Sequence, residues 1–170
     1  SSTVAGATDY SLANLAKTRD PRFEASFDSE ANPIASSLIY GNKFVSRAAY
    51  KMPVSDASYA SWSSNTNITD APVIRYAEVV LNWVEAKQIL AENFGGAPVT
   101  QSDIDKSINA IRKRPLDAVA IAKGVKKTAP LLLASIVADP SRDPDVSPLM
   151  WEIRRERRME FVFEFSRLHD

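Results

Sequence analysis

Apolar residues recur at helical spacing most clearly over residues 73–94. Asp70 and Pro72 precede this segment, and Gly95 and Gly96 follow it, which is the usual punctuation at the two ends of a helix. Two apolar stripes run along it, one through Ile74, Ala77, Leu81 and Val84, the other through Tyr76, Val80, Trp83, Leu90 and Phe94. A surface helix usually carries one stripe. We therefore expect this helix to be central, with neighbours on two sides.

A second helix is predicted over residues 100–114. Thr100 or Ser102 can cap its start, and Pro115 ends it because proline cannot continue a helix. Its apolar stripe consists of isoleucines at helical spacing, Ile104, Ile108 and Ile111.

A third helix is predicted over residues 148–168, where Ser147 and Pro148 form a cap and a first helical residue. Its stripe starts with Leu149 and Ile153 and then becomes charged, at Glu156 or Arg157 and at Glu160 and Glu164. An isolated charge is too costly to bury. Either this side faces water, with ion pairs along the helix, or the carboxylates meet arginines inside the fold. The residues considered for such a network are Arg75, Glu78, Glu85, Arg112, Glu156, Arg157 and Glu160.

The rest of the chain is rich in proline, serine and asparagine. Residues 9–18 are expected to form a short opening helix, and residues 129–138 another. Long irregular stretches are unusual in compact domains unless they bind something. We therefore expect a single domain over residues 1–170, in which 1–72 is mostly loop and insert and 73–170 is the helical core.

Composition narrows the function classes. The 170 residues include 21 basic and 21 acidic ones, which disfavours nucleic acid as a partner. There is no cysteine, so disulfide scaffolds and thiolate metal sites are excluded. No apolar run is long enough to cross a membrane, and the first residues do not resemble a signal peptide.

Candidate binding chemistry lies in the loop at 40–68. Sugars are held by aromatic rings that stack on their apolar faces and by amides that bind their hydroxyl groups. Four candidate ligand-binding residues combine these properties: Trp62, Tyr59, Tyr50 and Asn65. The alternative is that Tyr40 and Tyr50 anchor a long loop to the core.

Catalytic and metal chemistry have weaker signals. Glu78 and Glu85 share a helix face and could form the paired carboxylates of a glycosidase, although structural pairing with arginines is favoured. No nucleophile elbow or phosphate-binding loop is present. Oxygen ligands for calcium could come from Asp139, Asp143 and Asp145, but they lack EF-hand spacing and turn capping is favoured. No metal or other cofactor is therefore expected.

Four motifs occur in an order that resembles the SusD/RagB family. IRYAEVVLNWVEAK at 74–87 resembles that family's R-Y-A-E-x-x-L-N helix, and SINAIRKR at 107–114 resembles its I-N-x-I-R-x-R element. EIRRERRMEFVFEFSRLHD at 152–170 resembles its E-R-R-x-E-F-x-F-E-G helix, and DPRF at 20–23 matches a signal that precedes these. The chain departs from the pattern at Val84, at Pro115 and Leu116 (usually Ala-Gly), and at Phe165 (usually Gly).

The resemblance implies a mainly α fold of tetratricopeptide-like helical hairpins with long irregular loop insertions. It also implies capture of oligosaccharides or other nutrients, without catalysis, for a SusC-like TonB-dependent outer-membrane transporter. Members sit on the outer-membrane surface through a lipid anchor, expected here in an N-terminal part that this chain does not include. The competing interpretation is a helical-repeat domain that binds a protein partner.

Overall fold

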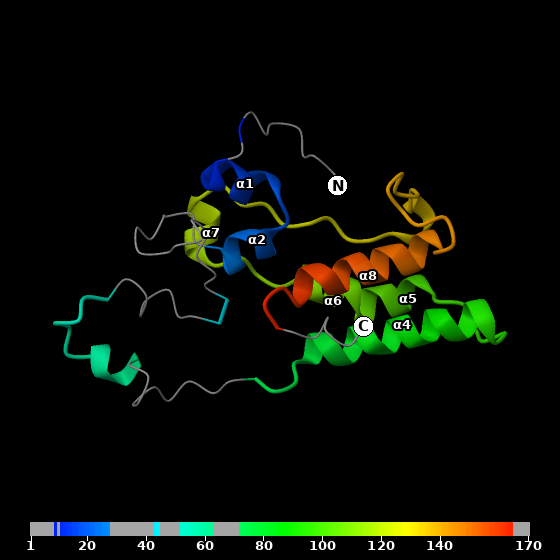
Figure 1. The fold of residues 1–170 in the computed structure, drawn as a ribbon, viewed down its shortest axis with the longest axis horizontal. Coiled ribbons are helices and arrows are strands. Elements are labelled where there is room, and N and C mark those ends of the chain that lie inside the picture. Colours follow the sequence, from blue (N-terminus) through cyan, green and yellow to red (C-terminus); the bar gives the residue numbers. More distant parts are fainter. Residues whose placement is uncertain (1–8, 10, 28–42, 45–51, 63–71, 165–170) are drawn as a thin grey trace.

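The structure is a computed structural model that describes residues 9, 11–27, 43–44, 52–62 and 72–164. It is mainly helical, so the predicted mainly α fold class is confirmed, whereas the tetratricopeptide-like arrangement stays a prediction (Figure 1). The predicted cap at Asp70 lies outside the described residues, as does the end of the third predicted helix beyond Glu164. In the described part of the chain, no helix is long and apolar enough to span a membrane.

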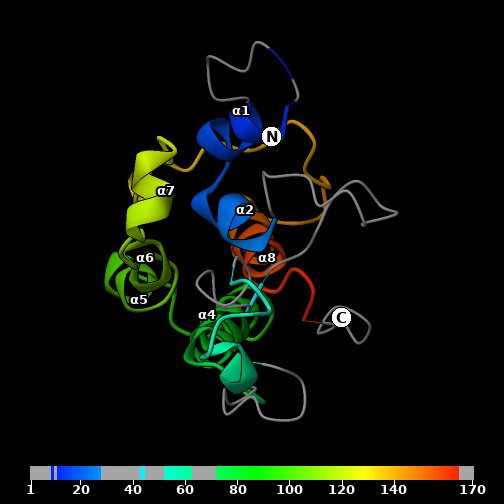
Figure 2. The same ribbon diagram turned by 90° about the vertical axis from the view of Figure 1, so that its left-hand side faces the viewer.

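The helices stack around α8, which comprises Pro148–Glu160. Figure 2 shows α8 between α4 (Tyr76–Asn93) on one side and α2 (Pro21–Ser26) on the other, with α1 (Leu12–Thr18) beyond α2. Beside this stack lie three short helices, α5 (Gln101–Lys106), α6 (Ile108–Arg112) and α7 (Ala118–Ala122). Charged side chains of α8 can therefore meet residues from several elements.

The α4 helix begins at Tyr76, later than predicted, with Arg75 as a cap residue that makes no side-chain capping bond. Its first stripe is buried from Ala77 through Leu81 to Val84. The second stripe is exposed except for Val80, so the expectation of neighbours on two sides is wrong for the described part of the chain. The reason is that α5, α6 and α8 all contact α4 from its first stripe's side.

The second predicted helix is two helices, because the backbone departs from helical geometry at Ser107 (φ −114°, ψ −92°). The predicted cap at Thr100 is confirmed. Its side chain accepts from the Asp103 N–H, while Asp103 Oδ2 accepts from the Thr100 N–H at 2.8 Å. The isoleucines face inward as expected, and Ile104 and Ile108 are fully buried.

The predicted cap of α8 is also confirmed, since Ser147 accepts from the Met150 N–H and Pro148 is the first helical residue. The helix is shorter than predicted and ends at Glu160, with Phe161 as its C-cap. Phe163 then has a positive φ of 66°, which a continuing α-helix does not allow. The main core joins Ile153 of α8 to residues of α4, α5 and α6.

Two short helices were missed and one was predicted too long. In α2, Asp20 caps the helix and Pro21 is its first residue; in α7, Asp117 caps the helix by accepting from the Ala120 N–H. The helix predicted over 129–138 is only a 3₁₀ turn, Leu133–Ser135. The first predicted helix is present as α1.

Candidate functional site

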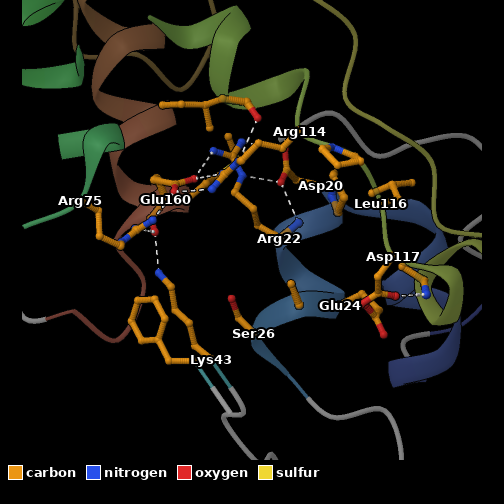
Figure 3. Close-up of a pocket in the computed structure, with 17 residues that line it drawn as sticks. Asp20, Arg22, Glu24, Ser26, Lys43, Arg75, Arg114, Leu116, Asp117 and Glu160 are labelled. Carbon is orange, nitrogen blue, oxygen red and sulfur yellow. Dashed lines mark hydrogen bonds and ion pairs between the residues drawn. The ribbon is translucent and has the colours of Figure 1, made fainter. Parts of the chain in front are cut away.

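The most highly connected carboxylate of the described residues is that of Glu160, at the end of α8. Arg114 donates to both of its oxygens, at 3.0 and 2.5 Å, and Arg75 donates to Oε1 at 2.9 Å. Arg22 adds a longer contact of 3.3 Å to Oε2. Figure 3 shows these side chains converging on Glu160 from separate parts of the chain. One carboxylate thus joins α2, the start of α4, the segment after α6, and α8.

One turn earlier, Glu156 is fully buried and is held in a similar way. Arg112 donates to Glu156 Oε2 through both Nε (3.0 Å) and Nη2 (2.8 Å). Arg22 Nη1 lies 2.7 Å from Glu156 Oε1. Arg22 therefore bridges Glu156 and Glu160, which lie on the same face of α8 because they are four residues apart.

These contacts change the acidity of the cluster. Burial alone would raise the pKa of Glu160, but the hydrogen bonds and charges of Arg114, Arg75 and Arg22 outweigh it and hold that pKa below its usual value. Burial likewise opposes ionisation of Asp20, yet Arg22 lowers the pKa of that carboxyl to about 2. Both groups are charged near neutral pH.

Lys43 binds the end of α8 and the residues that follow it. Lys43 Nζ donates to the carbonyl oxygens of Glu160 (2.5 Å) and Val162 (2.9 Å), and it forms an ion pair with Glu164. Arg75 also binds Glu164, at 2.6 and 2.9 Å. Burial lowers the pKa of Lys43, and Glu164 only partly opposes that effect.

A cavity of about 330 Å³ opens beside this cluster. Its walls come from α2, Lys43 and Phe44, Arg75, the turn between α6 and α7, and Glu160 (Figure 3). The apolar part of the lining is Pro21, Ala25, Phe44, Ile111, Pro115, Leu116, Ala120 and Met159. The cavity therefore combines an apolar wall with a charged edge to which Glu160 and its arginines belong.

The structure brings together four of the residues proposed for the ion-pair network, in two sets: Arg112 with Glu156, and Arg75 with Glu160. Three others are placed differently. Glu85 lies 3.6 Å from Arg154 at the surface, and Arg157 binds Asn82 and covers the Phe161 ring. Glu78 is half-buried and forms no ion pair with another described residue.

Sequence reasoning missed several members of the cluster, Arg22, Lys43 and Arg114 among them. Arg22 lies within the DPRF motif, and Asp20 with Pro21 is a helix-start signal that could have revealed α2. Arg114 is the last residue of the second predicted helix. No sequence signal placed Lys43 or the cavity-lining Phe44.

The proposed sugar-binding residues lie mostly outside the described part of the chain. Tyr59 and Trp62 belong to one 3₁₀ turn, Tyr59–Trp62, in which Tyr59 is half-buried. The side chain of Trp62, and Tyr50 and Asn65 altogether, lie outside the described residues. Their role in binding stays a prediction.

The aspartates considered for calcium organise turns. Asp139 accepts from the Ser141 N–H at 2.8 Å, which lowers the pKa of Asp139, and Asp143 accepts from the Asp145 N–H at 3.0 Å. Among residues that the structure describes, no group of histidine or acidic side chains could hold a metal ion.

A family model described as the SusD family matches residues 35–170. The chain belongs to the SusD family. The match includes α4 to α8, and with them Glu156, Glu160 and the arginines of the later helices. In this SusD-family chain, α2 and its Arg22 come before the matched residues. Comparisons with curated proteins and with solved structures returned no match. SusD-family membership indicates a glycan- or nutrient-binding protein.

Proposed function

We propose that this chain captures an oligosaccharide at the outer-membrane surface and passes it, chemically unchanged, to a SusC-like TonB-dependent transporter. The observation that carries this proposal is the SusD family match over residues 35–170. In this proposal the protein is held at the outer-membrane surface by a lipid anchor, as members of the family generally are.

The chemistry of the buried carboxylates supports a role without catalysis. Glycoside hydrolysis needs a pair of carboxyl groups, of which one is protonated when the reaction begins. The arginines around Glu160 lower its pKa and so favour its ionised form over the protonated one. Glu156 is enclosed by Arg22 and Arg112, so it has no open side for a substrate. These residues suit scaffolding better than acid–base chemistry.

The other candidate pair for hydrolysis, Glu78 and Glu85, is no better placed. Neither lines the cavity beside Glu160, and Glu85 faces Arg154 on α8. Ion pairs of this kind are common between packed helices and do not indicate a catalytic role.

The ligand surface that we propose includes Trp62, Tyr59, Tyr50 and Asn65, because stacking rings beside an amide suit a sugar. The test is a glycan array, followed by calorimetric titration of the oligosaccharide that binds. Tyr59→Ala and Trp62→Ala are expected to weaken binding about tenfold, the order of a lost aromatic contact, without changing the melting temperature. Tyr76→Ala is the matched control, because Tyr76 is a 71% exposed tyrosine on α4. Equal affinity for all variants would exclude this surface, and binding of no glycan would contradict the function.

The exposed stripe of α4 favours a second candidate, a helical domain that binds a protein. Tyr76, Val79, Leu90 and Phe94 are each more than half exposed, and Trp83 is 43% exposed. Contiguous apolar side chains on a surface are typical of protein contacts. If this candidate is correct, the chain binds no glycan and Trp83→Glu abolishes binding of the protein partner. Glycan binding that is unchanged in Trp83→Glu would count against it.

A further inference from the structure

We propose that the cavity beside Glu160 is a binding site for one uncharged sugar ring of the captured oligosaccharide. The inference rests on the proposed function and adds to it a position and a ligand chemistry. It is separate from the surface around Tyr59 and Trp62, neither of which lines the cavity. The inference is argued from the cavity, the hydroxyl group of Ser26 in its wall, and the aromatic ring of Phe44.

The size and lining of the cavity suit a small ligand. Its volume of about 330 Å³ lies at the lower end of the range for ligand sites, roughly 300–1,000 Å³. The apolar wall, which includes Leu116 and Met159, can cover the hydrogen-bearing face of a sugar ring. The opposite edge is polar, and the ion pairs of Glu160 hold it in place.

Ser26 places a hydroxyl group at the wall of the cavity. The residue is only 3% exposed, and its side chain makes no hydrogen bond to another described residue. Figure 3 shows the hydroxyl turned toward the space between Lys43 and Arg22. A hydroxyl group can both donate and accept a hydrogen bond, so a ligand hydroxyl in the cavity would pair with that of Ser26.

Phe44 supplies an aromatic ring at the cavity. Its φ of 67° is in the left-handed region, which is strongly unfavourable for a bulky side chain. Strain of this kind gathers at functional sites. The ring is 55% exposed and is flanked by Lys43 Nζ at 5.4 Å and by the Arg75 guanidinium at 5.5 Å. An exposed aromatic ring beside polar groups can stack on the apolar face of a sugar.

The charges around the cavity argue for an uncharged ligand. The positive side chains of the lining are Arg22, Lys43, Arg75 and Arg114, and the negative ones are Asp20, Glu24, Asp117 and Glu160. The two sets balance, so the site has no electrostatic preference for an anion. It offers both donors and acceptors, which is what a hydroxyl group requires because it can act as either.

The experiment is a calorimetric titration of the full chain with the oligosaccharide identified on the array, and with a matched version in which uronic acids replace the hexoses. Phe44→Ala and Ser26→Ala are expected to lower the affinity for the neutral oligosaccharide about tenfold, and Phe44→Trp is expected to restore it. Phe94→Ala is the control, since Phe94 is 74% exposed at the end of α4. Melting temperatures, measured in parallel, show whether each variant is folded.

The outcomes separate the two proposals. Binding by the wild type that is equal in Phe44→Ala and Ser26→Ala would overturn the cavity site and leave the proposed function standing. Tighter binding of the uronic-acid version would overturn the claim that the cavity binds an uncharged sugar ring. A wild type that binds no glycan would remove the proposed function and this inference together. If Phe44→Ala and Ser26→Ala fold and lose affinity while Phe94→Ala and Phe44→Trp keep it, the site is supported.

Discussion

The guanidinium of Arg112 and the carboxylate of Glu156 face each other at 2.8 Å inside the protein, with side chains 6% and 0% exposed. Neither group would be buried alone, because an unpaired charge in the interior is very costly. Each therefore makes the burial of the other possible. The same reasoning applies to Glu160, whose arginines come from three other segments of the chain.

Removing the Glu160 carboxylate is expected to destabilise the fold strongly. In Glu160→Ala, three arginines lose their shared partner, and the expected loss is about 3–5 kcal/mol in the free energy of unfolding, measured by urea denaturation. Glu85→Ala is the matched control. Its ion pair with Arg154 is 3.6 Å long and half of the Arg154 side chain is exposed, so the expected loss is below about 1 kcal/mol. Equal losses in the two variants would place Glu160 outside the scaffold.

Acid is expected to weaken the fold through Asp20. Its pKa is about 2 in the folded protein and about 4 in an unfolded chain. Because the folded pKa is the lower one, the stabilisation is complete above about pH 4 and disappears as the pH falls toward 2. The ionised Asp20 is expected to contribute about 2 kcal/mol to the free energy of unfolding.

The measurement is the free energy of unfolding between pH 5 and pH 2, as a difference between the wild type and Asp20→Asn. The difference isolates Asp20 from Asp103, whose pKa is also lowered to about 2, by hydrogen bonds from Lys87 and Thr100. The variant is expected to have the shallower pH dependence. Identical slopes would show that Asp20 is not held by Arg22.

The two faces of α4 are expected to respond differently to truncation. Leu81 is fully buried, so Leu81→Ala should cost about 2–5 kcal/mol. Val79 is 54% exposed on the same helix, and Val79→Ala should stay within about 0.5 kcal/mol. Thermal or urea unfolding of both variants provides the comparison. A large loss in Val79→Ala would mean that the outer face is covered in the folded protein.

The start of α8 offers a test of helix capping. The Ser147 hydroxyl accepts from the Met150 N–H at 3.2 Å. Ser147→Ala should cost about 0.5–2 kcal/mol of unfolding free energy, and Ser147→Asp should retain most of the stability because it keeps an acceptor. If both variants lose the same amount, the cap does not contribute in this way.

The elements that the sequence predicts best are those with both periodicity and end signals. Ser147 with Pro148, and Thr100, mark the starts of α8 and α5 correctly, and the apolar stripe of α4 identifies the core. The break at Ser107 could not be predicted, because the isoleucine spacing continues through it. The backbone conformation at Ser107 is set by tertiary packing and not by local helix propensity.

The site is harder to predict than the fold, because its members are far apart in the sequence. The acidic stripe of α8 indicates that Glu156 and Glu160 need partners, but it does not say which arginines reach them. Arg22 comes from a segment that the pattern assigned to a loop. Phe44 and Ser26 carry no distinctive motif at all. Only the folded chain brings them to one cavity.

The most direct test of capture without catalysis asks whether the bound oligosaccharide is recovered chemically unchanged. The wild-type chain is incubated with the oligosaccharide that it binds, and the ligand is recovered and analysed by mass spectrometry. We expect saturable binding and an oligosaccharide recovered at its full length. Shortened products that disappear in Glu78→Gln or Glu85→Gln would show a hydrolase and would contradict capture without catalysis.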